Sequence, residues 1–215
     1  MGHITVTAST MSKAQRLMQP MIDYADREKS KVSSTSAIEQ EYSVAIVMGS
    51  DSDRPVLQPG IDILEHFNIP YTTRVTSAHR TPAWMAEYAS SAKDKGIKCI
   101  IAAAGGAAHL PGMCAAYTRL PVIGVPIKPT MGDGMDSLLS IANMPRGVPV
   151  ATVGLNNSTN AALLAARILG VTDDEVDELY EAYILNTEQE VMEKDRKMKE
   201  RADVAQAERK SSAKK

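Results

Sequence analysis

The sequence predicts an α/β fold in which helices cover both faces of a parallel sheet. Apolar, β-branched runs of strand length recur along the chain, and segments with apolar residues at helical spacing separate them. Short connections marked by Gly or Pro join the two kinds of element. Continuous apolar strands that alternate with helices are typical of a sheet buried on both faces. We therefore expect a three-layer α/β/α sandwich of the flavodoxin or Rossmann-like kind, with a helical extension at the C-terminus.

Five runs have the apolar content and the length of buried strands: residues 43–48, 71–77, 98–104, 121–125 and 149–155. Helical spacing marks four segments between or after them: residues 54–67, 82–95, 135–143 and 157–169. Ser52 or Asp53 is the expected N-cap of the first helix. Thr81 as N-cap and Pro82 in the first helical position begin the second.

The two ends of the chain depart from this alternation. Residues 29–42 are rich in Ser and Lys, which indicates a linker between a segment 1–28 and a domain over 43–193. Residues 194–215 are dense in charge and indicate a solvated helix or a disordered tail. Before that tail, apolar residues recur at helical spacing: Val176, Leu179, Tyr180, Tyr183 and Ile184. This face fits a neighbouring subunit and the chain's own domain equally well.

Composition excludes several classes of function. Lys and Arg number 24 against 26 Asp and Glu, so no overall field attracts nucleic acid or a membrane surface. The two cysteines, Cys99 and Cys114, make neither a disulfide framework nor a zinc cluster, and core positions in a reducing compartment suit both. No run is long and apolar enough to span a bilayer, and the first residues lack a secretory signal. We expect a cytoplasmic protein with no nucleic-acid or membrane partner.

His79 and Arg80 stand on the loop that follows the second strand. Such loops lie at the carboxyl ends of parallel strands, where ligands bind and helix amide groups favour negative charge. An imidazole beside a guanidinium indicates acid/base chemistry on an anion. Taken alone, however, the hexapeptide 77–82 favours a simpler interpretation, a capped helix with a surface histidine.

Three more loops add chemistry at the same edge. Residues 49–53 offer hydroxyls and open amides that can cradle phosphate, although a plain capped helix start fits as well. Residues 104–113 are small, and their glycines permit positive φ; His109 within them is a catalytic partner or a residue that orders its own loop. Residues 126–134 make a loop that is long for this fold, and the sequence fits either a lid over the site or an ordinary surface loop. Neither a dinucleotide fingerprint nor a Walker motif occurs.

Together these segments resemble the PurE family. The resemblance covers about residues 43–184 and rests on five motifs in order: Gly49-Ser50-Asp51-Ser52-Asp53, Ser77-Ala78-His79-Arg80-Thr81-Pro82, residues 104–113, residues 136–145 and residues 160–166. The His-Arg-Thr-Pro and Ala-Ala-His-Leu-Pro-Gly sequences look like the class I branch of the family. Five motifs in the right order are far more specific than any one of them.

The resemblance implies a role in de novo purine biosynthesis, the conversion of N5-carboxyaminoimidazole ribonucleotide to 4-carboxy-5-aminoimidazole ribonucleotide. The alternative is direct carboxylation of aminoimidazole ribonucleotide by carbon dioxide, as in the other branch. Neither metal, biotin nor ATP is expected as a cofactor. Members assemble as octamers, so a homo-octamer is expected. The start of the chain, Met1 to Val6, and residues 158–163 resemble fungal members, in which an ATP-grasp carboxylase domain precedes this one; residues 1–28 would be its tail.

Carried over residue by residue, the resemblance implies that Ser50 and Arg80 hold the substrate phosphate, Asp53 holds the ribose hydroxyls and His79 is the general acid/base. Seven further residues complete the implied substrate-binding set: Ser52, Ser77, Gly105, Gly106, Ala107, His109 and Leu110. The loops over residues 105–112 and 132–134 would confine carbon dioxide beside the ring. Arg54 departs from the family pattern, where Trp is common, and puts the entrance of the site in doubt.

A non-enzymatic, flavodoxin-like module that binds a phosphorylated ligand is the alternative from another functional class. It accounts for the sheet and for residues 49–53, but leaves the loops of His79 and His109 without a purpose.

Overall fold

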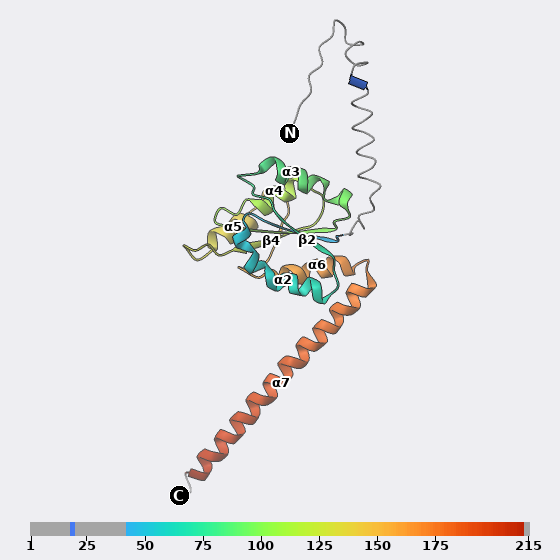
Figure 1. Ribbon diagram of the computed structural model, residues 1–215. Coiled ribbons are helices and arrows are strands. Elements are labelled where there is room, and N and C mark those ends of the chain that lie inside the picture. Colours follow the sequence, from blue (N-terminus) through green and yellow to red (C-terminus); the bar gives the residue numbers. More distant parts are fainter. Residues whose placement is uncertain (1–17, 20–41, 213–215) are drawn as a thin grey trace. The chain divides into compact units, whose positions relative to one another are not determined.

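The protein is described by a computed structural model that covers residues 18–19 and 42–212. Its centre is a parallel sheet with the strand order β2-β1-β3-β4-β5 (Figure 1). The strands are β1 (Val44–Met48), β2 (Tyr71–Val75), β3 (Cys99–Gly105), β4 (Val122–Ile127) and β5 (Ala151–Thr152). All four strand pairs are parallel, which confirms the predicted sheet.

Helices cover both faces of this sheet, as predicted (Figure 1). They are α2 (Arg54–His66), α3 (Pro82–Ser91), α4 (Leu110–Tyr117), α5 (Met135–Ala142), α6 (Ser158–Gly170) and α7 (Asp174–Ser212), with 3-10 turns η1 (Asp51–Asp53) and η2 (Lys93–Lys95). Residues of β1, β3 and β4 contribute alternately to two separate cores. Ile46 packs in the cluster with α2 and α6, whereas the next residue, Val47, packs in the cluster with α3 and α4.

Three elements differ from the sequence prediction. The fifth strand pairs over only two residues, because Ala151 and Thr152 reach β4 while Pro149 has no N–H to donate to a ladder. The helix that begins at Pro82 ends at Ser91 rather than near Lys95, and the chain continues through η2 to Gly96 in the left-handed conformation. Helix α4 was not predicted, because its many small residues give no apolar period to detect.

Helix caps at the predicted positions also differ in detail. Ser50, not Ser52 or Asp53, is the capping side chain after β1: it accepts from the Ser52 amide and begins η1. Asp53 holds the N-cap position of α2 without a side-chain bond to that helix. Thr81 likewise stands at the N-cap of α3 but does not cap it, since its hydroxyl donates to the carbonyl oxygen of Ser77.

The N-terminal part of α7 packs on the chain's own domain. Val176 is buried, and Leu179, Tyr180 and Tyr183 pack against the core cluster that contains Phe67. Ile184 is the exception and is exposed. The helix continues through residue 194 to Ser212, so the helical alternative holds for the described part of the charged tail. The predicted segments 1–28 and 29–42 lie outside the described residues, apart from residues 18, 19 and 42.

Strand order decides where a ligand can bind. The chain leaves β1 toward β2 on one side of the sheet, and leaves β3 toward β4 on the other. The loops after β1 and β3 therefore diverge at their carboxyl ends, which opens a crevice at the switch point of the sheet. The residues predicted to bind substrate or to transfer protons lie at this edge, in the loops that follow β1, β2, β3 and β4.

Candidate functional site

A cavity of about 660 Å³ lies at the carboxyl edge of the sheet. Loops that follow β1, β2, β3 and β4 all contribute to its lining, so four segments far apart in the sequence meet there. The lining includes ten residues that sequence reasoning selected: Ser50, Ser52, Asp53, Ser77, His79, Arg80, Gly105, Ala107, His109 and Leu110. The volume suits a small ligand of nucleotide size.

The loop after β1 is held by a reciprocal cap. The Ser50 hydroxyl accepts from the Ser52 amide at 3.3 Å, and the Asp53 carboxylate accepts from the Ser50 amide at 3.3 Å. The hydroxyl of Ser52 also donates to that of Ser50 at 2.9 Å. These contacts present two hydroxyls and one carboxylate to the cavity in a fixed arrangement.

Partial burial raises the pKa of the Asp53 carboxyl above its ordinary value of 3.8, and the bond from the Ser50 amide only partly offsets that effect. The folded state therefore disfavours the charged carboxylate that is present at neutral pH. Asp53 lines the cavity although partial burial disfavours its charge, which makes it a candidate ligand-binding group.

Asp53→Asn is expected to raise the melting temperature at pH 7, by on the order of 1–2 °C. The sign follows from proton linkage. A carboxyl group whose pKa is higher in the folded than in the unfolded protein stabilises the folded state while it is protonated, at pH below the unfolded pKa. That stabilisation is lost as the pH rises through the folded pKa. The gain should thus vanish toward pH 3, where both forms are neutral. Thermal unfolding at the two pH values measures it, with Asp94→Asn, an exposed aspartate outside the cavity, as the matched control. A melting temperature lowered at pH 7 would contradict this account of Asp53.

Arg80 ties two of the loops together. Its Nη2 donates to the carbonyl oxygen of Gly49 at 2.9 Å, and its Nε donates to the Ser77 hydroxyl at 3.3 Å. Within the described part of the chain, Nη1 has no hydrogen-bond partner, so this side of the guanidinium can bind an anion. Ser77 is itself buried, which gives the guanidinium a fixed support.

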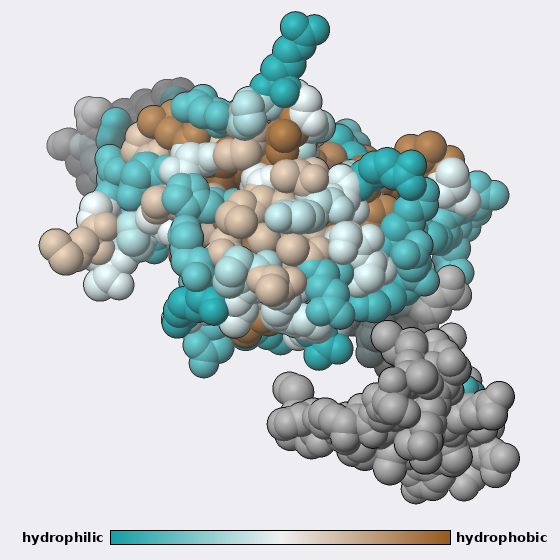
Figure 2. Space-filling model, turned by 90° about the horizontal axis from the view of Figure 1, so that it is seen from above, coloured by the Kyte–Doolittle hydropathy of each residue, from teal (hydrophilic) through white to brown (hydrophobic). Residues whose placement is uncertain are grey.

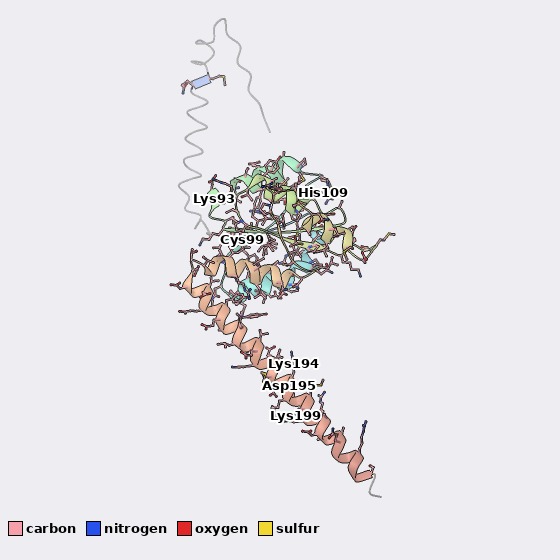
Figure 3. All side chains as sticks on the ribbon, turned by 180° about the vertical axis from the view of Figure 1, so that it is seen from behind. Lys93, Cys99, His109, Lys194, Asp195 and Lys199 are labelled. Carbon is pink, nitrogen blue, oxygen red and sulfur yellow. The ribbon has the colours of Figure 1, made fainter. Side chains whose placement is uncertain are left out.

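His79 and His109 meet across the cavity, although thirty residues separate them in the sequence. Nε2 of His79 lies 2.7 Å from Nδ1 of His109, and the ring planes are inclined by 73°. His109 lies on the α3 and α4 side of the sheet (Figure 3). This contact leaves both predicted roles of His109 open, as a catalytic partner and as a residue that orders its own loop.

The small-residue loop after β3 is braced from α5. The amide of Gly106 donates to the Ser137 hydroxyl at 2.8 Å, and that hydroxyl donates to the carbonyl oxygen of Ile127 at 2.8 Å. Gly106 has φ of +65°, as expected for a glycine in this turn. Unlike Gly105, it is not among the residues that line the cavity, so its predicted contact with substrate stays a prediction.

In the loop after β4, the residues that line the cavity are not the ones that the sequence predicted. Ile127, Lys128, Pro129 and Thr130 line the cavity, whereas residues 132–134 do not. The Lys128 amide donates to the Asn156 side chain at 2.9 Å, which holds this loop against the chain after β5. Lys128 adds a second cation to the site, and its charge in a loop at the sheet edge was the signal that could have identified it.

Several residues with reactive side chains stand elsewhere. Arg54 donates to Gln58 along α2 and is not among the residues that line the cavity. Cys99 and Cys114 are buried free thiols, as predicted, and burial raises the pKa of each to about 12.

Within residues 42–212, no group of three or more His, Cys, Asp or Glu side chains is placed to hold a metal ion. No described helix is long and apolar enough to cross a membrane.

Comparison with known proteins gives one consistent result. The sequence profile of the AIR carboxylase family matches residues 43–190. The chain is 52% identical over 195 residues to a phosphoribosylaminoimidazole carboxylase of Candida albicans, covering 90% of this chain and 34% of the relative. It is 54% identical over 157 residues to an N5-carboxyaminoimidazole ribonucleotide mutase of Pyrococcus horikoshii, covering 73% of this chain and 89% of the relative.

Solved structures agree with the sequence comparison. A variant of Treponema denticola PurE superposes with a TM-score of 0.65 at 29% identity, covering 72% of this chain and 96% of that chain. The chain spans about a third of the length of the fungal relative and nearly all of the archaeal one.

Proposed function

The chain belongs to the AIR carboxylase family, and from this membership we propose that it converts N5-carboxyaminoimidazole ribonucleotide to 4-carboxy-5-aminoimidazole ribonucleotide in purine biosynthesis. One observation supports the proposal above the others. His79 and Arg80 are adjacent in sequence and line one cavity, in which Arg80 reaches toward the β1 loop while His79 reaches toward His109. An anion-binding end and a proton-transferring end thus share one site.

The phosphate of the ribonucleotide binds at the Arg80 end. Nη1 of Arg80, which has no hydrogen-bond partner among the described residues, and open amides of the β1 loop provide donors there. The Ser50 hydroxyl donates to Asp51 in the structure and would exchange that bond for one to the phosphate. Asp53, from the same loop, accepts from the ribose hydroxyls, a role that makes use of its retained charge. The imidazole ring of the substrate then extends toward His79.

Arg80→Lys is expected to raise KM for the ribonucleotide by about 10²-fold, with a smaller effect on kcat. A lysine ammonium has three N–H donors, but they radiate from one nitrogen and do not reproduce the planar fork with which Arg80 bonds Gly49 and Ser77 and leaves Nη1 for phosphate. Steady-state kinetics measure the split between KM and kcat. Arg119→Lys, outside the cavity, is the control and should leave both constants unchanged. An unaltered KM in Arg80→Lys would remove Arg80 from the phosphate site.

His79 provides the acid and the base in turn. A protonated His79 gives its proton to N5 as the bond from N5 to the carboxyl carbon breaks, which releases carbon dioxide and leaves a neutral imidazole. C4 then bonds to the carbon dioxide, and the neutral imidazole takes the C4 proton. One proton is given and one is taken, so a single side chain completes the cycle.

Carbon dioxide must stay beside the ring between the two steps. Ala107, Ala108 and Leu110 supply small, apolar lining near His109, and Ile127 and Pro129 add apolar lining from the end of β4 and the loop after it. Apolar side chains offer carbon dioxide no hydration and no competing nucleophile, and they hold it near C4.

Steady-state assays with two substrates test the proposed activity. The N5-carboxy compound is compared with aminoimidazole ribonucleotide plus bicarbonate at matched concentrations. The proposal predicts turnover of the N5-carboxy compound well above its spontaneous decay, and a much lower rate from the second mixture. Turnover no faster than spontaneous decay would contradict it, and a preference for free carbon dioxide would establish direct carboxylation instead.

Three further properties are part of the proposal. The fungal relatives are about three times as long as this chain, which supports fusion to an ATP-grasp carboxylase domain in the whole protein. Exposed Val75, Trp84 and Tyr117 belong to β2, α3 and α4, and hydrophobic residues gather on the α3 and α4 side (Figure 2), which supports burial of that side in a homo-octamer. A cytoplasmic location suits a purine enzyme and stays a prediction.

A further inference from the structure

His109 touches His79 through one specific pair of ring nitrogens. Nε2 of His79 and Nδ1 of His109 are 2.7 Å apart, with ring centroids at 4.9 Å. At this separation a single proton lies between the two nitrogens, and one ring donates while the other accepts. The proton position on one imidazole therefore decides the proton position on the other.

Two arrangements satisfy this contact when both rings are neutral. In the first, Nε2–H of His79 donates to Nδ1 of His109, and Nδ1 of His79 carries a lone pair. In the second, Nδ1–H of His109 donates to Nε2 of His79, and Nδ1 of His79 carries a proton. Only the first survives protonation of His79, because an imidazolium carries protons on both nitrogens and can only donate.

Resting on the proposed function, in which His79 is cationic at one step and neutral at the next, we infer that His109 accepts from Nε2–H of His79 throughout the cycle. Nδ1 of His79 is then the atom that gives its proton to N5 and later takes the proton from C4. The proton on Nε2 never leaves. His109 is thus a positioning residue, which selects the reactive nitrogen of His79 without itself exchanging a proton with the substrate.

The backbone around His109 suits this role. His109 occupies the N-cap position of α4, its carbonyl oxygen accepts from the Met113 amide at 3.0 Å, and Leu110 next to it is buried. His79 stands on the loop before α3, where the Ser77 carbonyl accepts from the Thr81 amide at 3.0 Å. Backbone hydrogen bonds thus anchor both segments that carry the rings, the loop before α3 and the start of α4.

Nitrogen-15 NMR of protein labelled at histidine tests the inference directly, since the chain has four histidines and ring nitrogen shifts distinguish the two tautomers. His79→Asn and His109→Asn assign the signals. At a pH where both rings are neutral, we expect a proton on Nε2 and none on Nδ1 of each ring. A proton on Nδ1 of His109 would overturn the inference. This readout needs no turnover, so it is independent of whether the proposed reaction is correct.

Two substitutions separate hydrogen bonding from space filling. Asn places an oxygen near the position of Nδ1 and can accept from His79, whereas Phe keeps the ring volume and cannot accept. We expect His109→Asn to keep kcat within about 10-fold and His109→Phe to lose about 10²-fold, with KM changed little in both. Normal kcat in His109→Phe, or equal losses in the two variants, would overturn the positioning role. Normal kcat in His79→Asn would instead contradict the proposed function.

Discussion

Replacement of His79 by Asn is expected to lower kcat by about 10³-fold or more, equivalent to about 4 kcal/mol of transition-state stabilisation. Asn resembles the imidazole in size and polarity but neither gives nor takes a proton near neutral pH. Both proton transfers of the proposed cycle would lose their group. Affinity for the ribonucleotide should stay within a few-fold, because the proposed phosphate and ribose ligands, Ser50, Asp53 and Arg80, are unchanged.

His66→Asn is the matched control for this loss. His66 is an exposed histidine at the end of α2, where it lies near Phe67 and Tyr183 rather than in the cavity. We expect its kcat to equal that of the wild type. Product formation from the N5-carboxy compound measures both variants, and gel filtration checks that assembly is unchanged. Activity of His79→Asn within 10-fold of the wild type would exclude His79 as the general acid/base.

Replacement of Phe67 by Ala is expected to lower the free energy of unfolding by about 3–5 kcal/mol. Phe67 is the one phenylalanine of the chain and is 1% exposed. Its ring centroid lies 5.8 Å from that of Tyr180 and 5.7 Å from that of Tyr183, so it joins the end of α2 to α7. The truncation removes a buried ring and also the surface on which α7 packs.

Urea unfolding measures the loss for Phe67, and limited proteolysis reports release of α7. Met198→Ala is the control, because Met198 lies on α7 itself and is 68% exposed. Its truncation should cost well under about 1 kcal/mol. A comparably small effect for Phe67→Ala would show that α7 does not depend on this contact.

Much of the fold could be predicted because strands and most helices carry a clear apolar period. The sheet, its two covered faces and helices α2, α5 and α6 appear close to the expected bounds. Helix α4 could not be predicted from periodicity, since Gly112, Ala115 and Ala116 give it no apolar stripe. The fifth strand was overestimated because β-branched residues favour extended chain whether or not a neighbouring strand is in reach.

The candidate site was predictable for a different reason. Each chemical motif follows a strand, and the carboxyl ends of parallel strands converge at one edge whatever the details of the loops. Contacts between loops were not predictable, because they depend on how far side chains reach. Three contacts are of this kind: the hydrogen bond from Arg80 to Gly49, the hydrogen bond from Gly106 to Ser137, and the contact between His79 and His109.

Transfer of an isotopic label tests the central claim most directly. The N5-carboxy compound is labelled with carbon-13 in its carboxyl group and converted in buffer that holds excess unlabelled bicarbonate and carbon dioxide. If the carboxyl group migrates from nitrogen to carbon within the cavity, most of the 4-carboxy product formed at early times keeps the label. Product whose label has fallen to the level of the dissolved carbon dioxide pool would contradict migration within the site.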